Sequence, residues 1–296
     1  MSTNVQAIRR LVSKFWVHST GVDSLAHRIQ SYLPLYCFEA GPAVTRISST
    51  YLDTPNLDLY RDRVLAPQHP HFLIRFRWYN RLGSGPVFIE LKQRGLPGQP
   101  DFKRRFPVRP DAVHAFMRGA CDLDLLAAGH ASEAERGRLQ AYLDELHAFV
   151  AGRELRPTVH VQCFRQSFQR SAEDGRVRLT LDTRLSMRPT RGGDPLSGFG
   201  GPVHYFPWAI LEVKLQNERP AWLDELLREP GIEPAPRFSK YAHGVAMLYP
   251  VEDLALPVPA WTRVYTLGGT RRVAAPRLWA TRWLSPAYSE GGDSPD

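Results

Sequence analysis

The sequence predicts an α+β protein built on an antiparallel β-barrel, with peripheral helices and a cationic tunnel through its centre. Six short segments alternate polar and apolar residues, as strands with one polar and one apolar face do. Arg and Lys dominate the polar face. The segments recur along most of the chain with helical stretches between them, which indicates an α+β fold built on a barrel. They span residues 75–77, 90–92, 103–105, 163–165, 178–182 and 212–214.

The expected elements follow from periodicity and from turn signals. Alternation predicts strands over residues 45–53, 72–79, 87–93, 101–108, 158–170, 176–186 and 209–216. Helices are expected over residues 22–32, 111–118, 132–150, 222–228 and 239–249, with a turn or short helix over 55–61. The first helix ends before Pro34, and Ser132 with Glu135 matches a capping box.

Two regions differ in composition. Residues 1–250 are expected to form the tunnel domain, and residues 251–296 a C-terminal extension rich in Pro, Gly, Arg and Trp, with a disordered end over 285–296. The chain has no apolar run of about 18 residues, its first residues lack the apolar stretch typical of a signal peptide, and its three cysteines lack metal-ligand spacing. We therefore expect a cytoplasmic protein without a transmembrane segment. Whether the extension docks on the barrel, a membrane-associated partner or a membrane surface is left open.

The positive charge is concentrated in the predicted tunnel. The chain has 38 Lys and Arg and 30 Asp and Glu, a net charge of +8. Eleven candidate tunnel cations less three acids give the same +8, so the rest of the surface would be neutral, which favours one anion site and no nucleic-acid partner. The set is Lys14, Arg75, Arg77, Lys92, Lys103, Arg105, Arg165, Arg178, Lys214, Arg237 and Lys240, with Glu90, Asp182 and Glu212.

Three places in this set can be interpreted in two ways. Arg75 and Arg77 share a strand face and would repel unless an anion bridges them; the alternative is a solvent-facing edge strand. Glu212 lies in an apolar strand and would need either a divalent metal or a neighbouring cation. Ser239 and Lys240 open a helix, which suits either a phosphate site or an ordinary N-cap.

Read in order, these segments resemble the polyphosphate polymerase domain of the VTC (vacuolar transporter chaperone) family, within the triphosphate tunnel metalloenzyme superfamily. The resemblance covers roughly residues 10–250. It rests on the order and spacing of eight short motifs, each weak alone. They are KFWVH (14–18), STYLD (49–53), IRFRWY (74–79), FIELK (88–92), KRRF (103–106), VRLTLD (177–182), LEVKL (211–215) and FSKY (238–241).

The resemblance implies an ATP-dependent polymerase that transfers the γ-phosphate to a growing polyphosphate chain, with pyrophosphate as a primer. It implies Mn²⁺ or Mg²⁺ held by Glu212. Phosphate contacts map onto Lys14, Arg75, Arg77, Lys92, Lys103, Arg165, Arg237, Ser239 and Lys240, and the strand pattern adds Arg105, Arg178 and Lys214. Of these, Arg75, Arg77, Lys92, Arg165 and Lys240 are expected to act on the reacting phosphates. Cys163 stands where the family motif has a tyrosine.

Two other functions remain open at this point. A hydrolase of the same tunnel fold would cleave tripolyphosphate or nucleoside triphosphates, but it would be expected to carry an acid-rich ExExK motif near the N-terminus, which this sequence lacks. A non-catalytic polyphosphate-binding accessory protein would be expected to lose several tunnel cations, and this chain keeps nearly all of them.

Overall fold

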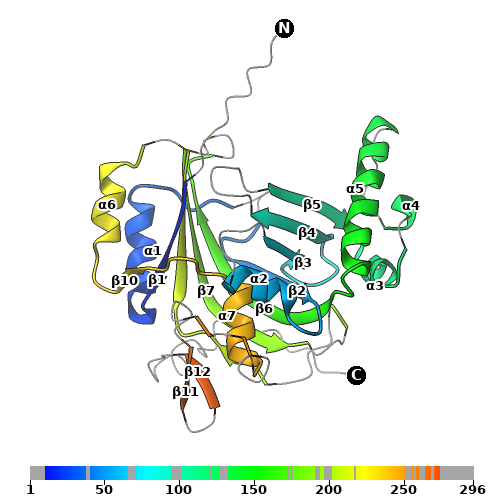
Figure 1. Cartoon of the computed structure of the whole chain (residues 1–296). Helices are drawn as coiled ribbons and strands as arrows, with labels where there is room; N and C mark the ends of the chain where they lie inside the picture. Colours follow the sequence, from blue (N-terminus) through cyan, green and yellow to red (C-terminus); the bar gives the residue numbers. More distant parts are fainter. Residues whose placement is uncertain are drawn as a thin grey trace, which may run out of the picture.

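The computed structural model describes most of the chain. The described residues are 11–37, 41–65, 71–94, 102–120, 122–126, 133–171, 174, 176–190, 194–196, 202–216 and 218–250, with short pieces between 255 and 273. A ten-stranded antiparallel sheet forms the centre, and helices lie around it (Figure 1).

The sheet runs in the order β10-β1-β9-β7-β6-β2-β3-β4-β5, with β8 beside β7. Long strands alternate apolar and polar residues, so each has one face for a core and one for charge. The bounds are β1 Leu11–Val17, β2 Thr45–Asp53, β3 His71–Tyr79, β4 Val87–Arg94, β5 Phe102–Val108, β6 Arg156–Phe168, β7 Val177–Pro189, β8 His204–Tyr205, β9 Ala209–Leu215 and β10 Ile232–Pro234.

The predicted closure into a barrel is wrong for the part of the chain that the structure describes. The sheet curls but stays open, because β10 pairs only with β1 and β5 pairs only with β4. Proline has no N–H to donate to a neighbouring strand. Pro234 is the last residue of β10 and Pro236 lies two residues beyond it, and Pro107 removes one backbone N–H donor from β5. Alternation shows which face is polar, but it does not show whether the two edges meet.

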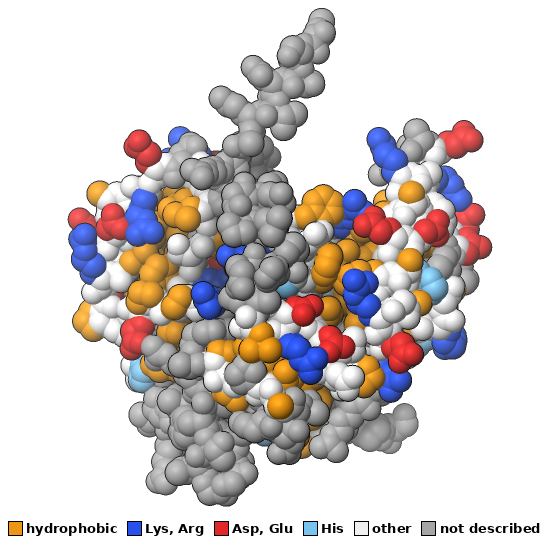
Figure 2. All heavy atoms as spheres, viewed as in Figure 1, with side chains coloured by type: hydrophobic (Ala, Val, Ile, Leu, Met, Phe, Trp, Pro, Cys, Tyr) orange, Lys and Arg blue, Asp and Glu red, His pale blue; other side chains and the backbone are white. Residues whose placement is uncertain are grey.

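Helices cover the outer face of the sheet in two groups. On one side, α1 (Val22–Gln30) and α6 (Ala221–Leu227) pack on β1, β7 and β9 through a buried cluster that includes Leu25, Ile29 and Leu211. On the other, α3 (Val113–Met117), α4 (Leu123–Leu126) and α5 (Glu133–Ala151) cover β3, β4 and β5. Acidic and basic side chains are interspersed over the visible surface in Figure 2.

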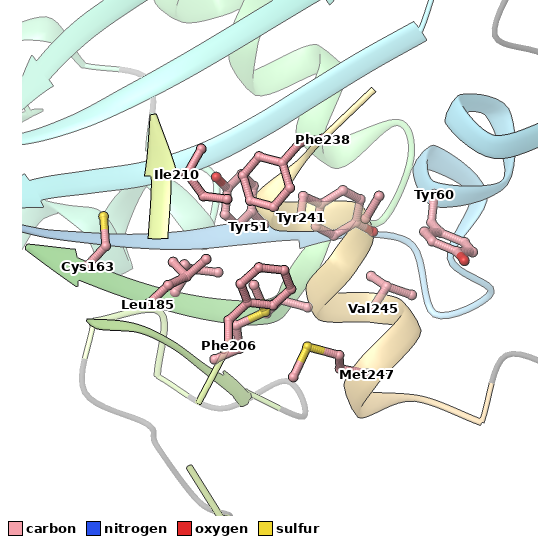
Figure 3. Packing of buried hydrophobic residues seen from close by; sticks show 14 of the residues in the cluster. Tyr51, Tyr60, Cys163, Leu185, Phe206, Ile210, Phe238, Tyr241, Val245 and Met247 are labelled. Carbon is pink, nitrogen blue, oxygen red and sulfur yellow. The ribbon is translucent and has the colours of Figure 1, made fainter. Parts of the chain in front are cut away.

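The inner face is half apolar. Helices α7 (Lys240–Leu248) and α2 (Asp58–Leu65) pack against it through a cluster that includes Tyr51, Cys163 and Tyr241. Figure 3 shows side chains of the strands and of α7 turned toward one another in this cluster. Because α7 and α2 fill this half, the polar residues of the same face are left as a separate ionic half.

Most sequence-based boundaries agree with the structure to within a few residues, and residues 45–53 match β2 completely. Strand β1 was not assigned from the sequence, nor were α4, β8 and β10. The C-terminal region contains a hairpin, β11 (Val264–Leu267) and β12 (Thr270–Val273). The capping box at Ser132 and the expected disorder over residues 285–296 lie outside the described residues. Among the described helices, none is long and apolar enough to cross a membrane.

Candidate anion-binding site

The strand register gathers the predicted cations on the inner face. Directly opposed residues in neighbouring strands point to the same side of a sheet. Following the pairs from β1 to β5 therefore places one residue set together: Lys14 with Glu212, Lys214 with Arg178, Arg165 with Asp182, Arg75 with Glu90 and Arg105, and Lys92 with Lys103. With Arg77 on β3 and Lys240 at the start of α7, ten cations share this region with three carboxylates.

Glu90 is the centre of the first ion-pair group. Its carboxylate is fully buried, and four cations surround it: Arg75 at 2.5 Å, Lys103 at 3.1 Å, Arg105 at 3.5 Å and Arg77 at 3.9 Å. Burial would raise the pKa of Glu90, but Arg75, Arg77 and Lys103 hold it well below its ordinary value. One negative charge among four positive ones leaves a surplus that suits a multiply charged anion.

The two arginines of β3 differ in how well the protein neutralises them. Arg75 donates from Nε and Nη2 to Glu90 and from Nη1 to the Tyr51 hydroxyl at 2.9 Å. Arg77 donates to the Ser49 hydroxyl at 3.0 Å, and burial followed by the charge of Arg75 lowers its pKa. Both are buried on an interior strand, so the solvent-facing alternative is wrong. Of the two arginines, Arg77 is the one whose charge the protein neutralises less.

Asp182 holds the second group together. It accepts two hydrogen bonds from Arg165, from Nε at 2.6 Å and from Nη2 at 2.7 Å, and it also pairs with Lys240. Burial would raise the pKa of Asp182, but both cations lower it strongly. Ser239 is the N-cap of α7 and accepts from the Ala242 amide, so the ordinary capping role is present here. Lys240 is thereby fixed beside Arg165.

Glu212 and Lys14 belong to the third group. Glu212 pairs with Lys214 at 2.6 Å and lies opposite Lys14, whose ammonium donates to the Phe238 carbonyl at 2.9 Å. Desolvation lowers the pKa of Lys14 to about 8. The expected cationic neighbour of Glu212 is therefore present. Among the described residues, no group of three His, Cys, Asp or Glu side chains could hold a metal, so a divalent ion at Glu212 would take its other ligands from phosphate oxygens or water.

The remaining predicted residues lie at the border of the ionic half. Lys92, Lys103 and Arg105 are exposed on the inner face, and Arg178 is half-buried opposite Lys214. Arg237 is exposed in a turn with a φ of 61°, two residues before the N-cap of α7. The three basic residues of β5 split by face, since Arg104 points outward to Glu145 on α5.

Cys163 lies near charged residues of both the Glu90 group and the Asp182 group. It is 2% exposed, and burial, followed by the charge of Asp182, raises the pKa of its thiol. Its nearest charges also include Lys240, Arg165 and Arg77. A tyrosine at this position would place a larger side chain in this buried cluster, where overfilling displaces neighbouring side chains.

Sequence reasoning missed residues that position the cations. Tyr51 and Ser49 hold Arg75 and Arg77, and the alternation of β2 could have indicated them because both fall on its inner-facing positions. Asp53 accepts the amides of Leu59 and Tyr60 at the start of α2 and the hydroxyl of Tyr241. It links α2, α7 and β2. No strand pattern indicated its role.

The charge of Lys92 makes anion binding dependent on pH. Arg75 first, and then reduced hydration within the curled sheet, place the pKa of Lys92 well below 10.5. A bound anion raises that pKa again, so affinity is highest while Lys92 is protonated and falls as pH rises. We expect tripolyphosphate affinity, measured by titration calorimetry, to begin to fall well below pH 10.5. The Lys92→Arg variant should retain more of its affinity at high pH; identical pH profiles would contradict this role.

The structure is thus an α+β protein with a curled antiparallel sheet, whose inner face gathers ten cations around three carboxylates. The model of the VTC domain family matches residues 9–249, and the chain belongs to this family. It is 33% identical over 290 residues to vacuolar transporter chaperone complex subunit 4 of Trypanosoma brucei brucei, covering 86% of this chain and 36% of that protein.

Two further relatives match over a similar share of the chain. The subunit 4 of Schizosaccharomyces pombe is 32% identical over 283 residues, covering 85% of this chain and 39% of the relative. Subunit 2 of the same yeast is 24% identical over 297 residues, covering 87% of this chain and 40% of the relative. The chain thus spans well under half the length of these relatives.

Proposed function

We propose that this chain is an ATP-dependent polyphosphate polymerase. The observation that carries the proposal is the inner face, where ten cations from eight elements surround three carboxylates that are each already ion-paired. The surplus positive charge would be balanced by a triphosphate and a phosphate chain. A non-catalytic accessory protein would be expected to lose several of these cations, and this chain keeps them, which favours the polymerase over the accessory alternative.

In phosphoryl transfer the protein mainly aligns the reactants and stabilises developing charge. A terminal oxygen of the acceptor chain attacks the γ-phosphorus of ATP, the bond to the β–γ bridging oxygen breaks, and ADP leaves. Arg77 and Lys92 would bind on one side of the reacting phosphates, and Arg165 and Lys240 on the other. Fixed cations stabilise the charge that develops on the phosphoryl oxygens. Cys163 stays a protonated thiol, so no protein nucleophile is invoked.

The open sheet changes how the product would be held. A polyphosphate chain would lie along the curled ionic face and slide over repeated equivalent contacts, without the closed bore that the sequence predicted. Mn²⁺ or Mg²⁺, held by Glu212 together with phosphate oxygens, would supply Lewis-acid charge when bound.

One experiment tests the proposed activity. Purified protein with ATP, Mn²⁺ and a pyrophosphate primer should yield long polyphosphate chains, resolved on a gel, with one ADP for each phosphate added. Orthophosphate as the main product would indicate a hydrolase. Tight polyphosphate binding without turnover would indicate an accessory protein.

The metal role of Glu212 has a separate test. We expect Glu212→Gln to raise the Mn²⁺ concentration needed for half-maximal synthesis by at least about 10- to 100-fold, the range that follows loss of a residue supporting a metal. Removing a negative charge should leave metal-free tripolyphosphate binding unchanged or tighter. Unaltered metal dependence would contradict the assignment, and a loss of metal-free binding would indicate a structural role.

A further inference from the structure

The end of β3 and β4 beyond Arg77 carries an aromatic pair on the inner face. Phe88 lies directly opposite Arg77, and Tyr79 lies one strand repeat further along β3. Their rings are 6.0 Å apart in an edge-to-face arrangement, and both are half-buried. The cationic row therefore ends in an apolar, aromatic surface at this end of β3.

Arg105 completes this surface as a fixed planar group. Its guanidinium lies 3.3 Å from the centre of the Phe88 ring and 5.4 Å from that of Tyr79. It donates to the Tyr79 hydroxyl at 3.2 Å and lies 3.5 Å from Glu90. A ring face, a hydroxyl and a carboxylate together fix the guanidinium plane. The Arg105 side chain remains 36% exposed, so the plane is held and accessible.

We infer that Tyr79, Phe88 and Arg105 form a stacking platform for the base of the nucleotide donor. A guanidinium on an aromatic ring offers a flat, polarisable surface on which any base can stack. The platform adjoins Arg77, so a stacked base would direct its triphosphate along Arg77 and Arg75. This inference rests on the proposed function and adds to it. Arg105 then acts on the base, where the sequence placed it among the phosphate contacts.

Stacking predicts little preference among bases. The inference assigns recognition to ring faces alone, which are common to adenine and guanine. ATP and GTP should therefore bind with affinities within a few-fold of each other, because stacking tolerates every base.

The test compares two ligands that differ only in the nucleoside. Dissociation constants for ATP and for tripolyphosphate are measured by calorimetry, without metal, on the whole chain. Phe88→Ala and Arg105→Lys should each raise the dissociation constant for ATP by about 5- to 50-fold, consistent with the loss of one base stack. The dissociation constant for tripolyphosphate should change less than about twofold in Arg105→Lys, since lysine keeps the positive charge and lacks only the planar guanidinium.

The chain offers a matched control. Arg104 lies over Phe102 at 4.6 Å on the outward side of the same strand β5, so Phe102→Ala removes an equivalent arginine–phenylalanine stack away from the site. It should leave both constants unchanged. If Phe88→Ala and Arg105→Lys weaken the binding of ATP and of tripolyphosphate equally, or change neither, the stacking platform is contradicted. If the wild-type chain binds neither ligand, the proposed function fails as well.

Discussion

Replacing Glu90 with glutamine is expected to destabilise the free protein by about 3–5 kcal/mol, the cost of leaving buried charges without their partner. The carboxylate is fully buried and is the only acid within 4.0 Å of Arg75, Arg77, Lys103 and Arg105 among the described residues. Glutamine keeps the shape but leaves four cations to repel one another. The free energy of unfolding, measured in urea, checks the result.

Polyphosphate should rescue this variant. A ligand that binds only the folded state stabilises it in proportion to the logarithm of its concentration over Kd, and the variant has more uncompensated charge for an anion to bind. The stabilisation gained on adding tripolyphosphate should therefore be larger in Glu90→Gln than in the wild type. Glu145→Gln is the matched control, because Glu145 pairs with Arg104 on the exposed outer face, where such a pair contributes about 0–1 kcal/mol.

The same carboxylate predicts how stability depends on pH. The pKa of Glu90 lies below its ordinary 4.5 in the folded protein. Its stabilising contribution is therefore complete above about pH 4.5 and is lost as pH falls below that value. The wild type should lose more stability between pH 5 and pH 3 than Glu90→Gln does. Parallel pH profiles would mean that Glu90 is not the anchor of this group.

The sequence predicted the ionic face because strand alternation is a local property. The two-residue period places Arg75 and Arg77 on one face of their strand, and Glu90 and Lys92 on one face of theirs. Once the two strands pair, these faces form one surface. Closure could not be predicted in this way, because it depends on whether β10 and β5 meet, and β10 begins 124 residues after β5 ends, at 232 against 108. Pro107 lay inside the predicted strand 101–108, but β10, which ends at Pro234, was not assigned from the sequence.

The positioning residues were harder to predict than the cations. Asp53 is buried between β2, α2 and α7, and burial raises its pKa to about 6 although four hydrogen bonds lower it. Such a role depends on the packing of three elements, and the spacing of residues around Asp53 does not encode that packing. The pairing of Lys240 with Asp182, 58 residues away, likewise depends on where α7 docks.

Arg77→Ala is expected to reduce kcat/KM for polyphosphate synthesis by about 10²–10³-fold, the cost of losing one preorganised group that stabilises developing charge. Arg77 is buried and lies 3.9 Å from Glu90, where Arg75 lies at 2.5 Å. The protein therefore neutralises the charge of Arg77 less than that of Arg75. Since Arg77 is repelled by Arg75, its removal should leave the free energy of unfolding unchanged or higher.

Comparison with Arg75→Ala distinguishes a role of Arg77 in phosphate binding from a role in folding. Arg75 contributes three hydrogen bonds, two to Glu90 and one to Tyr51, so its loss should lower both stability and activity. Arg104→Ala, on the outer face of β5, should alter neither. If Arg77→Ala unfolds as readily as Arg75→Ala, then Arg77 is part of the scaffold. If it retains full synthesis, the phosphates do not lie on β3, and the surplus charge of the inner face is neutralised elsewhere along the curled sheet.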